Sequence, residues 1–255
     1  MPPKLYGIEH IVYLIVFAVF TAAAVLVARF VTKTYKQKTI LIKSVGGVLL
    51  ASIIFNRIAL AVWHKNAVWL LPNSYCGMSS LLLGVFVLIG SPHHKTYDFL
   101  FYMEAVGGIS AVFYPYFIGQ GDSVFFPPTI SGLLHHSVGF ILCVLLVQCK
   151  WFTPLLSRWK AFPIGISVYT LYGLFLLDVC GMPEAMQIDA PIIAGTPLKW
   201  WFILIVGSAL LLVILLIIDH YGIKKTRAAA AVAKAQTLET TTAETAATTE
   251  ITENE

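Results

Sequence analysis

Long runs of apolar residues, separated by short polar links, fill most of the chain. Seven runs are long enough, or nearly so, to cross about 30 Å of hydrocarbon as α-helices. The third run is short, and the fourth contains the charged residue Glu104. The pattern predicts an all-α, polytopic membrane protein with seven transmembrane helices, at approximately residues 10–31, 41–63, 75–91, 98–118, 128–149, 162–181 and 199–219.

The composition agrees with this class. Hydrophobic residues make up 58% of the 255 residues and charged residues 12%, and the mean hydropathy is +0.81. A soluble domain of this length is much less apolar. We therefore expect a multi-pass protein of the cell membrane.

Lysine and arginine are distributed unevenly between alternate links. If the N-terminus lies outside, twelve of these residues fall in cytoplasmic segments and three in outer ones. Such a bias predicts that the N-terminus is outside and the C-terminus is cytoplasmic. The net charge of +4 then reflects topology, and no nucleic acid partner is expected.

The end of the chain differs in composition from the rest. After Arg227 it consists largely of Ala, Thr and Glu, without large apolar residues. This favours a disordered cytoplasmic tail over residues 223–255, following a seven-helix transmembrane domain over residues 1–222.

A cysteine stands at the predicted start of the third helix. Pro72 cannot lie inside a helix, and Asn73 and Ser74 are good N-cap residues, so the helix should begin beside Cys76. There the free backbone N–H groups and the positive end of the helix dipole favour a thiolate. The alternative is that Cys76 is a small apolar residue that fills a gap between helices.

Two adjacent histidines lie in the fifth predicted helix, which opens at Pro127-Pro128. His135 and His136 should lie about 10 to 12 Å below that end, at a depth similar to that of Cys76. Neighbouring residues on a helix point about 100° apart, so we expect one of the two rings to face the interior and the other to pack laterally. Structural hydrogen bonding by both rings is the alternative.

Further polar residues lie within or beside the predicted helices. Asn56 and Arg57 lie in the second helix, and Asp178 lies near the outer end of the sixth. Arg57 can pair with Asp178, bind a lipid phosphate or extend outward to water. Glu104 should hydrogen-bond within the bundle, with a proton relay as the functional alternative. Small residues in the same helix, at Gly107, Gly108, Ser110 and Ala111, predict a close helix–helix approach.

Four short motifs resemble those of the YwaF-like integral membrane proteins, a seven-helix bacterial family related to a eukaryotic transmembrane phospholipid acyltransferase. They read Leu71-Pro72-Asn73-Ser74-Tyr75-Cys76, Gly107 to Ala111 to Pro115, His136, and Pro197-Leu198-Lys199-Trp200, within a likeness over roughly residues 5 to 220. The chain departs from the family pattern at Ser74, where a histidine is common, and at Gly181-Met182-Pro183, where an Asn-Tyr pair is common.

The resemblance implies that Cys76 is the acyl-carrying nucleophile and His136 its base. The residue types agree with acyl transfer, which needs a nucleophile and a general base. The expected partners are membrane lipids, namely phospholipid and lysophospholipid, with Asn56, Arg57, Ser74 and Asp178 as substrate-binding candidates. No cofactor and no metal are predicted.

Two other interpretations remain open. A transporter or receptor-like bundle would use the buried polar residues as a pathway or ligand pocket, with Cys76 incidental. A structural interpretation pairs Cys76 with Cys180, because both are expected near the outer face, where oxidation is possible.

Overall fold

The computed structural model describes residues 6–114, 123–192 and 195–222, and the regular structure within these residues is helical. The long helices are α1 (Ile8–Leu26), α2 (Tyr35–His64), α3 (Tyr75–Ile89), α4 (Tyr97–Phe113), α5 (Pro127–Gln148) and α6 (Ala161–Asp178), followed by α7 (Trp200–Phe202), whose helix continues to Gly222. α1 ends in a π-helical turn over Val27–Val31, and α7 leads into another over Ile203–Gly207.

Five helical segments are long and apolar enough to cross a membrane. They cover Ile8–Val31, Tyr35–His64, Pro127–Gln148, Leu156–Asp178 and Trp200–Gly222. The two remaining helices, α3 and α4, have 15 and 17 residues and fall below that length. The all-helical class is thus confirmed, with five helices that could cross a membrane by length and composition, whereas the seven crossings and the orientation of the termini stay predictions.

Local sequence explains where the helices begin. Thr34 and Gln37 form a capping box at the start of α2, in which each side chain binds the backbone N–H of the other residue. The Pro127-Pro128 pair opens α5, as predicted, since proline fits the first turn of a helix. The predicted disordered tail lies outside the described residues.

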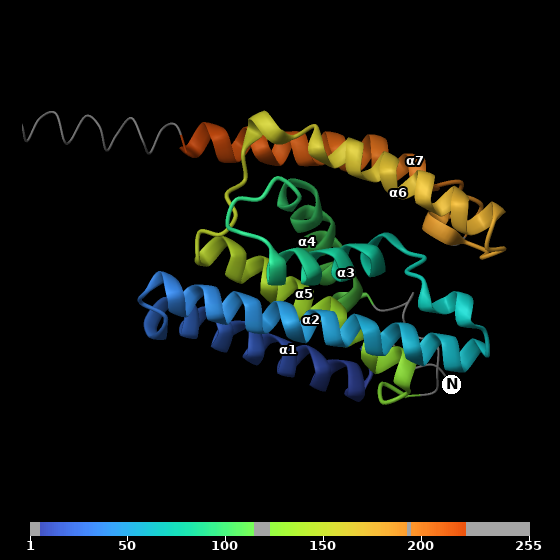
Figure 1. The fold of residues 1–255 in the computed structure, drawn as a ribbon, viewed down its shortest axis with the longest axis horizontal. Coiled ribbons are helices and arrows are strands. Elements are labelled where there is room, and N and C mark those ends of the chain that lie inside the picture. Colours follow the sequence, from blue (N-terminus) through green and yellow to red (C-terminus); the bar gives the residue numbers. More distant parts are fainter. Residues whose placement is uncertain (1–5, 115–122, 193–194, 223–255) are drawn as a thin grey trace, which may run out of the picture.

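The helices form an elongated bundle, in which successive helices alternate in direction (Figure 1). α1 and α2 lie along one face, and α6 and the helix that begins with α7 lie side by side along the opposite face (Figure 1). α3, α4 and α5 lie between these two layers. The candidate site residues come mainly from this middle layer and from α2.

α5 lies at the centre of the bundle, in contact with α1, α2, α3 and α4. In α5, 61% of an 18-residue apolar stretch is buried. In the corresponding stretches of α1 and of the last helix the buried share is 11% each. The two peripheral helices expose large apolar side chains, which is the surface that lipid chains cover. Polar side chains on α3, α4 and α5 are therefore shielded by protein on several sides.

Glycines allow close crossings in this core. A Cβ at Gly46 of α2 would lie 2.7 Å from Val87 of α3, and one at Gly84 of α3 would lie 3.3 Å from the backbone of Leu50. Both distances are too short for ordinary contact, so α2 and α3 approach each other more closely than larger residues would permit. This contact fixes the height of α3 relative to α2.

Candidate functional site

The cysteine turn has the predicted geometry. Ser74 is the N-cap of α3, and its hydroxyl accepts a hydrogen bond of 3.1 Å from the backbone N–H of Gly77. Cys76 is the second residue of the helix and is partly buried. The thiol therefore lies in the first turn, beside backbone N–H groups that have no partner within the helix.

The sulfur of Cys76 packs against a glycine of α4. A Cβ added to Gly107 would lie 2.6 Å from the Cys76 Sγ atom, and one added to Gly108 would lie 2.8 Å from the backbone oxygen of His136. The cysteine on α3 and the histidine on α5 thus contact neighbouring residues of the same α4 turn. The predicted close approach at these small residues is confirmed.

Both histidines are buried, contrary to the expectation that only one faces the interior. His135 is 4% exposed and His136 6%, and their rings lie side by side with centroids 4.2 Å apart and planes tilted by 33°. The Nδ1 atom of His135 lies 3.0 Å from the Ser80 hydroxyl. The Nδ1 atom of His136, also buried, has no hydrogen-bond partner.

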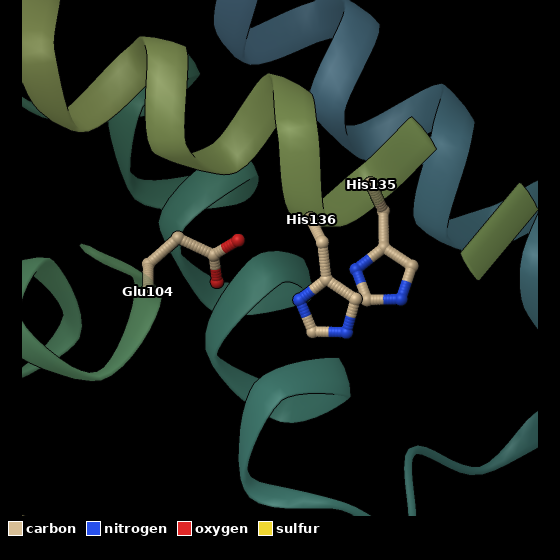
Figure 2. Close-up of side chains that lie close together, drawn as sticks. All are labelled: Glu104, His135 and His136. Carbon is tan, nitrogen blue, oxygen red and sulfur yellow. The ribbon is translucent and has the colours of Figure 1, made fainter. Parts of the chain in front are cut away.

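Glu104 completes a buried polar cluster with these rings (Figure 2). Its side chain is fully buried, and both carboxylate oxygens lie 2.9 Å from the Ser80 hydroxyl, which confirms the expected hydrogen bonding within the bundle. One ligand-type atom from each of Glu104, His135 and His136 lies within 4.8 Å of the others. Carboxylate and imidazole are also the groups that bind zinc in proteins.

Arg57 and Asn56 hold the cysteine turn onto α2 and α5. One terminal nitrogen of Arg57 donates to the side-chain oxygen of Asn73 at 3.0 Å, and the other donates to the side-chain oxygen of Asn56 at 2.5 Å. The amide of Asn56 in turn donates to the hydroxyl of Ser131 at 3.0 Å. The Nε atom of Arg57 is buried without a partner.

The proposed pairing of Arg57 with Asp178 does not occur in the structure. Asp178 is exposed at the end of α6, and the ion pair found among the described residues joins Arg158 to Asp98. Arg57 instead uses neutral oxygen atoms close to it in space, a side-chain amide at the cysteine turn and another on its own helix. Extension of Arg57 to water is likewise excluded, because its side chain is buried.

The cysteines carry no disulfide. All four are free thiols, with Cys143 and Cys149 buried and Cys76 and Cys180 partly buried. The thiol of Cys76 lies against α4, so the structural pairing of Cys76 with Cys180 is not found.

A segment after α6 covers the cysteine turn. The backbone N–H of Met186 donates to the carbonyl oxygen of Asn73 at 2.8 Å, and Met182, Ala185 and Met186 are buried. The Met186 side chain also fills the space beside Gly173 of α6, where a Cβ would lie 2.7 Å away. The segment between α6 and α7 is therefore attached to the cysteine turn.

Ser80 and Gly139 are the residues of this cluster that the sequence analysis missed. Ser80 follows Cys76 by four residues, which places both on one face of α3. Gly139 leaves the space that Glu104 fills, because a Cβ there would overlap the carboxylate oxygen. The four-residue spacing was a usable signal for Ser80, whereas the role of Gly139 depends on contact between two helices.

The fold and the site together define a helical membrane protein with a buried cluster of His, Ser and Glu side chains beside a partly buried cysteine. Its family can be stated directly: residues 5–219 match the TMEM164 family, and the chain belongs to it. No curated protein and no solved structure matches the chain. The narrower likeness to the bacterial YwaF-like proteins stays a prediction.

Proposed function

We propose that this protein is a Cys/His-dependent acyltransferase that acts on the acyl chains of membrane phospholipids. The observation that carries the proposal is that the Cys76 sulfur and the backbone of His136 pack against neighbouring residues of one α4 turn, at Gly107 and Gly108 respectively. A nucleophile at a helix start and an imidazole with an unpartnered nitrogen are the two groups that acyl transfer needs.

The reaction proceeds in two steps that share one base. His136 takes the proton of the Cys76 thiol, the sulfur attacks the ester carbonyl of a phospholipid, and the lysophospholipid leaves with that proton. The acyl chain remains on Cys76 as a thioester. The hydroxyl of an acceptor lysophospholipid then attacks the thioester, His136 takes the hydroxyl proton, and this proton returns to the sulfur as the new ester forms.

The backbone at the start of α3 is proposed to supply the hydrogen-bond donors that stabilise the oxyanion. A tetrahedral intermediate carries negative charge on the former carbonyl oxygen, and free N–H groups of a helix start stabilise such an oxyanion. The hydroxyl of Ser74 already occupies the N–H of Gly77. This leaves the N–H groups of Tyr75 and Cys76 as the donors proposed for the oxyanion.

Arg57 is proposed to contribute charge for the lipid phosphate, with Asn56 and Ser74 holding the turn. Its guanidinium lies beside the cysteine turn, where a Cβ at Gly77 would be 3.9 Å from the Arg57 Cζ atom. Arginine binds phosphate through paired N–H groups, which a lysine cannot reproduce. Asp178 is exposed at the end of α6, so its proposed role is contact with a lipid headgroup.

The proposed setting is the cell membrane, with seven crossings, the N-terminus outside and the C-terminus cytoplasmic. α3 and α4 would make the third and fourth crossings, since the helices alternate in direction along the bundle (Figure 1). The lysine and arginine bias of the links supports this orientation.

Trapping of the acyl-enzyme tests the proposal. The full chain in lipid nanodiscs is incubated with a phospholipid that carries a fluorescent acyl chain, and the label on the protein is treated with hydroxylamine, which cleaves thioesters. We expect a hydroxylamine-sensitive label on Cys76, located by peptide mass spectrometry. Cys76→Ser should lose the label, and His136→Ala should acquire it more slowly by about 100-fold or more, the usual contribution of a general base.

Cys143→Ser is the matched control, because Cys143 is a buried thiol of α5 that lies near the Phe101 carbonyl oxygen. It should label like the wild type. If wild-type protein carries no thioester, or if the label lies on Cys180, the acyltransferase proposal is wrong. Solute flux that persists in Cys76→Ala would then favour the transporter or receptor-like alternative.

A further inference from the structure

The carboxylate of Glu104 is buried without a positive partner among the described residues. Its side chain is 0% exposed, and its hydrogen-bond donor is the neutral hydroxyl of Ser80. Arg57, which shares this interior, donates to Asn56 and Asn73 instead. A buried ionised carboxylate in such surroundings is costly unless it takes up a proton or a positive charge arises beside it.

Ser80 fixes the roles of the groups around it. A hydroxyl has one proton, so when Ser80 donates it to the Glu104 carboxylate, its bond to the Nδ1 atom of His135 requires a proton on that nitrogen. His135 is then a hydrogen-bond donor that holds Ser80 in place. His136 remains the histidine with a buried and unpartnered Nδ1 atom.

The helix register places the carboxylate one turn away from the thiol. Glu104 and Gly107 are three residues apart on α4, and Cys76 and Ser80 are four residues apart on α3, so the contact of Cys76 with Gly107 and that of Ser80 with Glu104 lie one turn apart. All three helices thus direct polar groups toward one small region.

The position of Glu104 is defined by the shape of α5. Gly139 lies one turn beyond His136, and the carboxylate occupies the space that any side chain at Gly139 would need. A ring nitrogen of His136 lies within 4.8 Å of a carboxylate oxygen. Figure 2 shows the Glu104 side chain extending from α4 toward the rings carried by α5.

We propose that Glu104 is a positioning residue for the base: its carboxylate stabilises the imidazolium that His136 becomes when it takes the proton of Cys76. This inference rests on the proposed function. The Cys76 S–H bond breaks, an N–H bond forms on His136, and the electron pair left on sulfur forms the bond to the acyl carbon. The hydrogen bond from Ser80 holds the Glu104 carboxylate in position during this step.

The role suits the interior of a membrane protein. A proton transfer from thiol to imidazole creates two opposite charges where water cannot solvate them, and a fixed carboxylate beside the cation lowers that cost. Glu104 does not touch the ester, so its effect acts entirely through His136.

A double-mutant cycle tests the inference with the acylation rate as the readout. Single-turnover formation of the Cys76 thioester is measured in nanodiscs for wild type, Glu104→Gln, His136→Ala and the double variant. We expect Glu104→Gln to slow the rate by about 100-fold, within the range of general-base catalysis. The double variant should be no slower than His136→Ala alone, because both changes remove the same function, proton transfer to His136. Glu104→Asp should recover part of the rate.

Asp98→Asn is the control, because Asp98 is a buried carboxylate of the same helix that pairs with Arg158 and lies outside the cluster. It should acylate at the wild-type rate. If Glu104→Gln does not fold, Ser80→Ala is measured in its place. This variant keeps the Glu104 carboxylate but removes its hydrogen-bond donor, and it should slow acylation by about 10-fold.

Three results separate the outcomes. Wild-type rates in Glu104→Gln, with His136→Ala impaired, overturn the inference and leave the proposed function standing. An absence of thioester on wild-type protein overturns the proposed function itself. One equivalent of zinc on the purified wild type that is lost in Glu104→Gln also overturns the inference, because the cluster would then be a metal site.

Discussion

The contact between Gly107 and Cys76 provides a direct test of the helix register. In Gly107→Ala, the new methyl group would lie 2.6 Å from the Cys76 sulfur and 3.6 Å from its Cβ atom. Non-bonded heavy atoms prefer separations of roughly 3.5–4.0 Å. The sulfur therefore has to move by about 1 Å, whereas the Cβ atom of Cys76 can stay in place.

The expected energies follow from that difference. Overpacking of a tight core costs about 1–3 kcal/mol, and alanine in place of glycine inside a helix returns about 0.8–1 kcal/mol through helix propensity. In a Cys76→Ala background the clash is absent, so Gly107→Ala should be neutral or slightly stabilising there. The coupling free energy between the two positions should thus be about 1–3 kcal/mol.

The assay is reversible unfolding of the full chain in mixed detergent micelles with increasing sodium dodecyl sulfate, for wild type, both single variants and the double variant. Gly47→Ala on α2 is the control, because its new Cβ would lie 4.0 Å from the nearest neighbouring atom, in Leu88, which is ordinary contact. Equal effects of Gly107→Ala in the wild-type and Cys76→Ala backgrounds would refute the register on which the site is built.

Three more changes probe other contacts of the cluster, each measured by the same unfolding assay. Gly139→Ala would set a methyl group into the Glu104 carboxylate oxygen, so we expect a loss of about 3 kcal/mol or more, and a wild-type midpoint would contradict the placement of Glu104. Arg57→Lys cannot reproduce the bonds to Asn73 and to the neighbouring amide, and should cost about 1.5–3 kcal/mol, so that unchanged stability would show these bonds to be unimportant. Ser74→Ala removes the N-cap of α3 and should cost about 1 kcal/mol, whereas Ser74→Asp should keep most of the stability, and equal losses in both would argue against capping.

The helix starts could be predicted because each depends on a few neighbouring residues. Pro72, Asn73 and Ser74 place the start of α3 beside Cys76, and the Pro127-Pro128 pair places the start of α5. Hydropathy likewise predicts the long helices, since a membrane selects for apolar length. These signals are local in sequence and need no knowledge of packing.

The polar cluster could be predicted only in part. Cys76 and His136 stood out as residue types, but the joint burial of His135 and His136 and their link through Ser80 to Glu104 depend on the register between three helices. That register is set by close contacts at glycines, and sequence pattern does not show which neighbour a glycine will meet. The same reason explains why an Arg57–Asp178 pair was expected but not found.

In the proposed topology, in which α3 crosses the membrane, the shortness of this helix makes bilayer thickness a variable that acts on the proposed acyl-transfer site. Its 15 residues rise about 22 Å, which is about 8 Å less than a hydrocarbon core of about 30 Å. A helix shorter than its membrane is accommodated by local thinning of the bilayer or by burial of one end below the headgroups. Lipids with short chains would therefore bring the first turn of α3 level with the glycerol esters, and lipids with long chains would submerge it among the acyl tails.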